Sequence, residues 1–425
     1  MISAAEAQQL LQQGRVAEAE RAFASILEKD PGNVQALNVM ALVALRGEDL
    51  KTALLHIENA LRFDADNPLS LHNRGRILEA SQQYAEAAAS HRAALKRAPN
   101  LHAARLHLGR ALESRGDSRG AIVAYARALQ DAQADGRWLN KATTPAAFQP
   151  LVEHAVRQVR SGRRAAIDEL LRPVVAEFGG DALQRVHTAL RAYFNEEAPR
   201  IEDPRQHSTF FHFPDIPASP FLDTKLFPWI PSLEAVAADI RGELNGLLQQ
   251  SDGRERVFSS EALEEQNLRG LSQPPSWNGY YFFRHGEPRL DNRARCPNTA
   301  AALDTLPLCR VRDHGPEVLF SVFTPGTHLL PHRGVTNTRL VAHLPLMVPD
   351  DCALVVGGEE HRWREGKVVV FDDTYEHEAW NRSDKTRIVL IFDIWSPYLS
   401  EAERMAIALL IGDIGDFRHE VETAA

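Results

Sequence analysis

The chain has 425 residues, of which 44% are hydrophobic and 25% are charged, and its formal net charge is −9. This length is too great for one hydrophobic core, so we expect two or three domains. The negative balance argues against a nucleic-acid partner, because no basic stripe dominates the sequence. Three cysteines without a CxxC pair favour a reducing cytoplasm. The sequence begins without an export signal and contains no run of about 18 apolar residues, which argues against a membrane span.

The first 134 residues repeat with a period of 34. Small residues recur at this spacing, and a larger residue follows each of them four positions later. The small residues are Ala19, Ala53, Ala87 and Ala121, and the larger ones are Phe23, Ile57, His91 and Tyr125. This pattern is typical of tetratricopeptide repeats, in which alanine lets two helices approach and the larger residue fills the gap between them. Because one repeat cannot bury its apolar face alone, the sequence predicts an α-solenoid over residues 1–134.

The partner of this solenoid is open at this stage. The concave face of such a solenoid often binds a peptide, so a peptide or protein is one candidate. A role in scaffolding or dimerisation is the alternative. His91 occupies a packing position of the repeat and is interpreted as a core histidine rather than a ligand.

The repeat fades after residue 134. Residues 135–199 keep helical patterning without the 34-residue register, which predicts a helical cap or connector. Prolines then cluster between residues 204 and 231, which marks a boundary and the start of a different domain. We therefore expect a third region over residues 200–425.

Short apolar runs follow in this third region, separated by turn residues. They cover residues 279–283, 318–323, 339–346, 353–356, 368–371 and 387–395. Many short strands without alternating helices predict an antiparallel sandwich or barrel. Because side chains alternate along a strand, Arg339, Val341 and His343 should share one face, as should Arg387 and Asp393.

Two histidines and one arginine stand out against these strands. His332 precedes Arg333 and Gly334, His377 follows 45 positions later, and Arg387 comes ten residues after that. Two separated imidazoles can hold Fe(II), and a cation beyond the second can hold the far carboxylate of a 2-oxo acid. Taken singly, each histidine could equally be a surface or hydrogen-bonded residue, and Arg387 could be a cation at the end of a strand.

The residues around them carry a family resemblance. The motifs are residues 324–328, 331–334, 336–340, 365–373 and 376–378, followed by Arg387 and residues 393–395. This string, within residues 270–400, resembles the aspartyl/asparaginyl beta-hydroxylase family. Those proteins are Fe(II)- and 2-oxoglutarate-dependent dioxygenases with a double-stranded beta-helix (a jelly-roll or cupin-like fold), and members often carry tetratricopeptide-like helices in front.

The resemblance implies a role for five residues. His332 and His377 would bind Fe(II), Arg387 would bind the C5 carboxylate of 2-oxoglutarate, and Ser321 and His343 would contact this cosubstrate. The implied reaction uses O2 to hydroxylate an unactivated C–H bond, with the beta-carbon of aspartyl or asparaginyl residues in a peptide as the first choice of substrate. The alternatives are a lipid A-type acyl chain or small molecule, or a non-catalytic repeat adaptor with a degenerate barrel.

The sequence departs from related enzymes at several positions. Most 2-oxoglutarate oxygenases have a carboxylate where Gly334 stands, and the beta-hydroxylase family shares its absence; halogenation is a remote alternative for such a site. Val341 replaces an arginine that is common in the animal hydroxylases, and Cys296 and Cys309 do not reproduce their disulfide spacing. Asp372 and Asp373 are interpreted as capping or supporting residues of His377. A structural role is expected for His328, while Arg284, His285 and Arg289 line the substrate entrance or are simply solvated.

Overall fold

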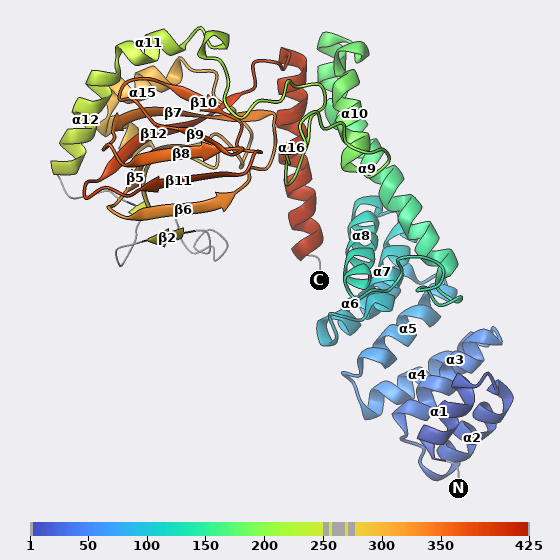
Figure 1. The fold of residues 1–425 in the computed structure, drawn as a ribbon. Coiled ribbons are helices and arrows are strands. Elements are labelled where there is room, and N and C mark those ends of the chain that lie inside the picture. Colours follow the sequence, from blue (N-terminus) through green and yellow to red (C-terminus); the bar gives the residue numbers. More distant parts are fainter. Residues whose placement is uncertain (1–2, 250–254, 257–267, 271–276, 424–425) are drawn as a thin grey trace. The chain divides into compact units, whose positions relative to one another are not determined.

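A computed structural model describes residues 3–249, 255–256, 268–270 and 277–423 (Figure 1). The chain forms two compact units, which we call the repeat unit (residues 1–169 with 414–425) and the β unit (residues 170–413). The structure confirms the predicted order of a helical repeat region followed by an antiparallel β domain. The finer division at residues 134 and 199 stays a prediction. No helix of the described ranges is both long and apolar enough to cross a bilayer.

The repeat unit is built from antiparallel helix pairs. Its repeat helices are α1 (Ala4–Gln12), α2 (Val16–Lys29), α3 (Val34–Arg46), α4 (Leu50–Phe63), α5 (Pro68–Ala80), α6 (Tyr84–Arg97), α7 (His102–Ser114) and α8 (Ser118–Ala134). The N-caps follow the same period, since the side chains of Asn33 and Asn67 accept backbone hydrogen bonds at the starts of α3 and α5. The predicted packing positions are buried, with His91 and Tyr125 fully inaccessible.

The remaining helices follow in chain order. They are α9 (Gln149–Phe178), η1 (Gly180–Leu183), α10 (Gln184–Tyr193), η2 (Thr224–Leu226), α11 (Ile230–Ala235), α12 (Ala237–Gln249), α14 (Leu290–Arg295), α15 (Pro297–Asp304) and α16 (Glu401–Thr423). Figure 1 shows α11, α12 and α15 lying along one side of the β structure.

The β unit contains two antiparallel sheets. The larger sheet has the order β1-β3-β5-β12-β7-β10 with β4 beside β3, and the smaller has the order β2-β6-β11-β8-β9. The strands are β1 (Glu255–Arg256), β2 (Leu268–Gly270), β3 (Trp277–Arg284), β4 (Glu287–Pro288), β5 (Val318–Phe323), β6 (Thr327–His332), β7 (Arg339–Met347), β8 (Cys352–Val356), β9 (Glu359–His361), β10 (Val369–Phe371), β11 (His377–Asn381) and β12 (Arg387–Trp395). This pair of sheets is the arrangement expected of a double-stranded beta-helix.

Strand alternation divides the larger sheet into two apolar faces. Phe320, Leu344 and Leu390 point to one side, where they join a core with Ile240 of α12 and Leu303 of α15. Phe323 and neighbouring residues point to the other side and pack against residues of the smaller sheet. Arg387 is the first residue of β12 and precedes Ile388, which faces the helices, so the Arg387 side chain enters the space between the sheets.

Candidate metal centre

His332 and His377 lie opposite each other on neighbouring strands. His332 is the last residue of β6 and His377 is the first residue of β11, and the antiparallel register of the two strands pairs these two positions. Their ring centroids are 4.1 Å apart. The fold therefore brings two imidazoles together that are 45 positions apart in the sequence.

Each of these rings is held by a main-chain carbonyl. The Nδ1 of His332 lies 2.8 Å from the carbonyl oxygen of Leu330, and the Nδ1 of His377 lies 3.1 Å from that of Tyr375. Because a carbonyl only accepts, each Nδ1 carries the hydrogen and each Nε2 keeps its lone pair for a metal ion. Burial, and then the nearby His332, lower the pKa of His377 to about 4, so its ring is neutral at pH 7.

Gly334 leaves room for a carboxylate from the turn that follows β10. A Cβ atom at Gly334 would lie 2.2 Å from Cγ of Asp373, so Asp373 fills the space that a side chain at position 334 would take. Its Oδ2 accepts a hydrogen bond of 2.5 Å from Arg339. Its Oδ1 is buried and has no partner among the described residues. An unpaired buried oxygen beside two imidazoles suits a hydrated metal ion, which can supply the missing donor.

Asp372, the neighbouring carboxylate, stabilises the turn that follows β10. Its Oδ1 accepts hydrogen bonds from the backbone and hydroxyl of Thr374 at 2.9 and 2.5 Å, and its Oδ2 accepts one from Gln206 at 2.6 Å. Burial raises the pKa of Asp372 to about 6. These contacts agree with the capping role expected from the sequence.

Arg387 is a buried cation that has no counter-charge among the described residues. It is 1% exposed, and its guanidinium carbon lies 4.0 Å from the ring centroid of Phe323 and 4.6 Å from that of Trp363. Burial lowers its pKa to about 9. No carboxylate in the described part of the chain pairs with it, and its Nε has no hydrogen-bond partner there. Because an unpaired buried charge is costly, this position suits an anionic ligand.

Ser321 and His343 lie beside this guanidinium. Ser321 Oγ accepts hydrogen bonds from Arg387 at 3.1 Å and from the Trp277 indole at 2.9 Å. His343 pairs with Ile391 of β12 in the sheet register, and its Nδ1 has no partner within the described residues. Burial, and then the charge of Arg387, hold the pKa of His343 well below its usual range, so the ring is neutral.

Phe371 connects the two groups of residues. Its ring centroid lies 5.0 Å from that of His343 and 5.7 Å from that of His377. The five residues singled out from the sequence therefore converge between the two sheets. Sequence reasoning missed Phe323, Trp363 and Trp277, because an aromatic residue in a strand or loop is normally read as core.

Other candidates from the sequence lie elsewhere or have structural partners. His328 contacts Glu378 at 2.7 Å, which agrees with a structural role. His285 contacts Glu317 at 3.1 Å, and Arg284 stacks on the ring of Tyr281 at 4.9 Å. These contacts give no support to the expectation that Arg284 and His285 line a substrate entrance.

Comparisons with known proteins agree with this arrangement. Residues 234–397 match the Aspartyl/Asparaginyl beta-hydroxylase family, and residues 4–68 and 72–137 match tetratricopeptide repeats.

Three relatives illustrate the range of proteins that this chain is similar to. The ornithine lipid ester-linked acyl 2-hydroxylase of Rhizobium tropici is 37% identical over 195 residues, which cover 45% of this chain and 66% of that protein. Human aspartate beta-hydroxylase domain-containing protein 2 is 28% identical over 246 residues, or 56% of this chain and 63% of that protein. Human aspartyl/asparaginyl beta-hydroxylase is 33% identical over 145 residues, or 34% of this chain and 19% of that protein.

The chain spans just under two thirds of the length of the first two relatives and about a fifth of the third. The match in residues 234–397 coincides with the two sheets that hold His332, His377 and Arg387. The β unit therefore carries a domain similar to the aspartyl/asparaginyl beta-hydroxylase family, in residues 234–397, and tetratricopeptide repeats precede it in the sequence.

Proposed function

We propose that the β unit is an Fe(II)- and 2-oxoglutarate-dependent dioxygenase that hydroxylates an unactivated C–H bond. His332 and His377 would hold the iron through Nε2, because their Nδ1 atoms are committed to carbonyl oxygens. Iron with 2-oxoglutarate and O2 supplies the oxidising power, and the protein supplies positioning and exclusion of water.

Arg387 carries the cosubstrate part of this proposal. Its guanidinium lies between the rings of Phe323 and Trp363 and has no carboxylate partner in the described residues. The C5 carboxylate of 2-oxoglutarate would supply that partner through a charge-assisted pair. Ser321 would help to hold the guanidinium, and the neutral His343 would offer a hydrogen bond to the bound acid.

Asp373 bears on the type of reaction. Its carboxylate fills the position in front of Gly334 where a halogenating site would need to hold a halide ion. The negative charge there disfavours a halide, and its free Oδ1 can accept a hydrogen bond from water in the site. Hydroxylation is therefore favoured over halogenation.

Two substrate classes remain as candidates. The beta-carbon of aspartyl or asparaginyl residues in a peptide is supported by the repeat region and by the relatives named for that activity. An acyl chain is supported by the 37% identity to the ornithine lipid hydroxylase and by Val341, which is apolar and offers no charge to a substrate carboxylate. We place the peptide first, with the concave face of the repeats as its holding surface.

An assay of cosubstrate consumption tests the enzyme proposal. Purified protein with Fe(II), ascorbate and 2-oxoglutarate should release succinate, and addition of an aspartyl or asparaginyl peptide or of an acyl lipid should increase the rate. His377→Ala should abolish the release, whereas His328→Ala should retain it, because His328 lies in the same sheet but contacts Glu378 instead.

The same assay separates the adaptor alternative. A chain that binds neither Fe(II) nor 2-oxoglutarate and releases no succinate with either substrate class would be an adaptor with a degenerate barrel. Equal loss in the His377→Ala and His328→Ala variants would mean that the loss reflects folding and would remove the support for His377 as a ligand.

A further inference from the structure

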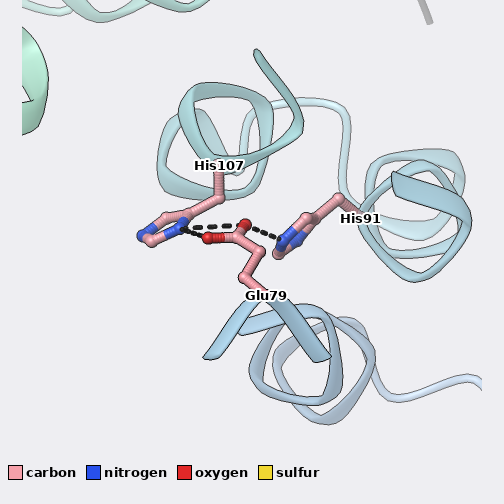
Figure 2. A group of neighbouring side chains, drawn as sticks. All are labelled: Glu79, His91 and His107. Atoms are coloured by element: carbon pink, nitrogen blue, oxygen red, sulfur yellow. Dashed lines mark hydrogen bonds and ion pairs between the residues drawn. The ribbon is translucent and has the colours of Figure 1, made fainter. Parts of the chain in front are cut away.

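A second group of potential ligand side chains lies inside the repeat unit (Figure 2). Glu79 projects from α5, His91 from α6 and His107 from α7, and all three are buried. Nε2 of His91 lies 2.8 Å from Oε1 of Glu79, and Nδ1 of His107 lies 3.2 Å from Oε2. The three ligand atoms lie within 4.8 Å of one another. The packing position assigned to His91 is correct, but the residue has polar neighbours that a plain core position lacks.

The protonation states suit a metal ion. Burial acts to raise the pKa of Glu79, but its contacts with His107 and His91 outweigh this and hold the pKa far below its ordinary value. Burial lowers the pKa of His107 to about 4. At neutral pH the group therefore contains a carboxylate and a neutral imidazole, which are the forms that coordinate metals.

Two further residues fix the orientation of these side chains. Nδ1 of His72 lies 3.2 Å from Nδ1 of His91, so this second ring can share a hydrogen with the first and orient it. The guanidinium of Arg110 donates to Oε2 of Glu79 with a contact of 2.6 Å from Nε, which leaves Oε1 facing His91. Ligation would require the hydrogen of each ring to move to its other nitrogen. It would also require Nη2 of Arg110, which lies 3.2 Å from Nδ1 of His107, to turn away from that nitrogen.

The following repeat provides an internal comparison. Glu113 and Tyr125 stand 34 positions after Glu79 and His91, and the Tyr125 hydroxyl donates a 2.7 Å hydrogen bond to Glu113. Gly75 makes room for the His91 ring as Gly109 does for Tyr125, since a Cβ atom would come within 2.4 and 2.5 Å of those rings. Burial and then Glu113 raise the pKa of Tyr125, so this phenol stays protonated and is a poor ligand. The same backbone thus carries a hydrogen-bonding group in one repeat and a potential ligand in the other.

We propose that Glu79, His91 and His107 bind one divalent transition metal ion, with Zn²⁺ as the best fit, and that the ion joins α5, α6 and α7. Two imidazoles and one carboxylate are a donor set that Zn²⁺ accepts, whereas Ca²⁺ and Mg²⁺ require mainly oxygen ligands. The site is independent of the proposed dioxygenase. It would stabilise the stack of repeats, because an ion that binds only the folded form shifts the unfolding equilibrium.

The test uses the full chain with His332→Ala and His377→Ala, so that the proposed iron site cannot contribute. After removal of metals with a chelator, one equivalent of Zn²⁺ should bind in equilibrium dialysis, and the unfolding temperature of the repeats should rise. Adding His91→Tyr should weaken Zn²⁺ binding by more than about 100-fold. This exceeds the loss expected when the residue removed only hydrogen-bonds to a metal ligand. The helical circular dichroism should stay unchanged, because Tyr125 shows that the repeat accepts tyrosine at this position.

Two further variants make the result decisive. His154→Gln removes the histidine that contacts Glu113 at 2.7 Å in the next repeat and should leave Zn²⁺ binding unchanged. Glu79→Gln, which keeps the side-chain shape, should weaken binding as His91→Tyr does and decides the question if His91→Tyr does not fold. A folded parent chain that binds no Zn²⁺, or Zn²⁺ binding that survives both Glu79→Gln and His91→Tyr, would overturn the proposal and leave a hydrogen-bond network only.

Discussion

Arg110 in the repeat unit and Arg387 in the β unit are both cations beside histidines, but within the described residues only Arg110 has a counter-charge. Arg110 pairs with Glu79 and keeps 43% of its side chain exposed. Arg387 is 1% exposed and contacts two aromatic rings and Ser321, with no carboxylate among the described residues. The charge of Arg110 is therefore balanced within the protein. The charge of Arg387 is balanced only when an anion binds, which is why we assign ligand binding to Arg387.

The histidines of the two units differ in their hydrogen-bond partners. In the β unit, main-chain carbonyls two residues earlier hold His332 and His377, so the Nε2 atoms are available. In the repeat unit, a carboxylate side chain contacts His91 and His107, so a metal ion must compete with hydrogen bonds that already satisfy these groups. The comparison indicates a site prepared for a ligand in one unit and an optional site in the other.

The largest expected effect concerns cosubstrate binding. Arg387→Met should raise the 2-oxoglutarate concentration needed for half-maximal succinate release by about 30-fold or more, because a buried charge-assisted pair is lost. Steady-state kinetics over a range of 2-oxoglutarate concentrations measure this. An unchanged requirement would remove Arg387 from the cosubstrate site.

The two arginines should also affect stability with opposite signs. Without ligands, Arg387→Met should leave the free energy of unfolding unchanged or raise it by about 1 kcal/mol or more, because an unpaired buried charge is removed. Arg110→Met should lower it by about 1–3 kcal/mol, because Glu79 loses its cation. Denaturant unfolding in a chelator measures both values, and a loss of stability in both variants would contradict the contrast between the two sites.

A smaller effect is expected at Gly334. Gly334→Ala should lower the free energy of unfolding by about 1–3 kcal/mol, because the new methyl group would overlap the carboxylate of Asp373. Adding Asp373→Ala should recover part of this loss. A double-mutant cycle measures this coupling. The predicted overlap is contradicted if the losses in unfolding free energy of the two single variants simply add up in the double variant.

An effect of comparable size is expected in the pH dependence of the β unit. Burial raises the pKa of Glu317 from 4.5 to about 7. Between these values the folded chain binds more protons than the unfolded chain, so stability should fall as pH rises, by on the order of 1–3 kcal/mol. Glu317→Gln should flatten this slope. Unfolding can be followed by tryptophan fluorescence, since Trp138 alone of the six tryptophans lies outside the β unit. An equal slope in both proteins would exclude Glu317 as its source.

The sequence was informative where a period or an alternation exists. The 34-residue spacing predicted the helical repeats, and strand alternation predicted that Arg387 and Asp393 share one face of their strand. The motif around His332 and His377 predicted that the two would meet, and the antiparallel register of β6 and β11 brings them together.

Contacts between distant segments could not be read in the same way. Trp363 comes from a loop and contacts Arg387 only because the two sheets face each other. His91 falls at a packing position of the repeat, and its spacing gives no sign that Glu79 and His107 lie beside it. Asp373 was expected to support His377, but its overlap with the space in front of Gly334 depends on the turn geometry.

Anaerobic titration with Fe(II) and 2-oxoglutarate tests the central claim most directly, because it separates metal binding from cosubstrate binding without requiring the substrate. All proteins in this titration carry Glu79→Gln, so that the metal site proposed in the repeat unit cannot take up Fe(II). The account predicts that Fe(II) strengthens 2-oxoglutarate binding, that His377→Ala prevents Fe(II) binding, and that Arg387→Met retains Fe(II) but loses most of the 2-oxoglutarate affinity. Fe(II) binding that persists in the His332→Ala and His377→Ala double variant, or 2-oxoglutarate binding that is indifferent to Arg387, would contradict it.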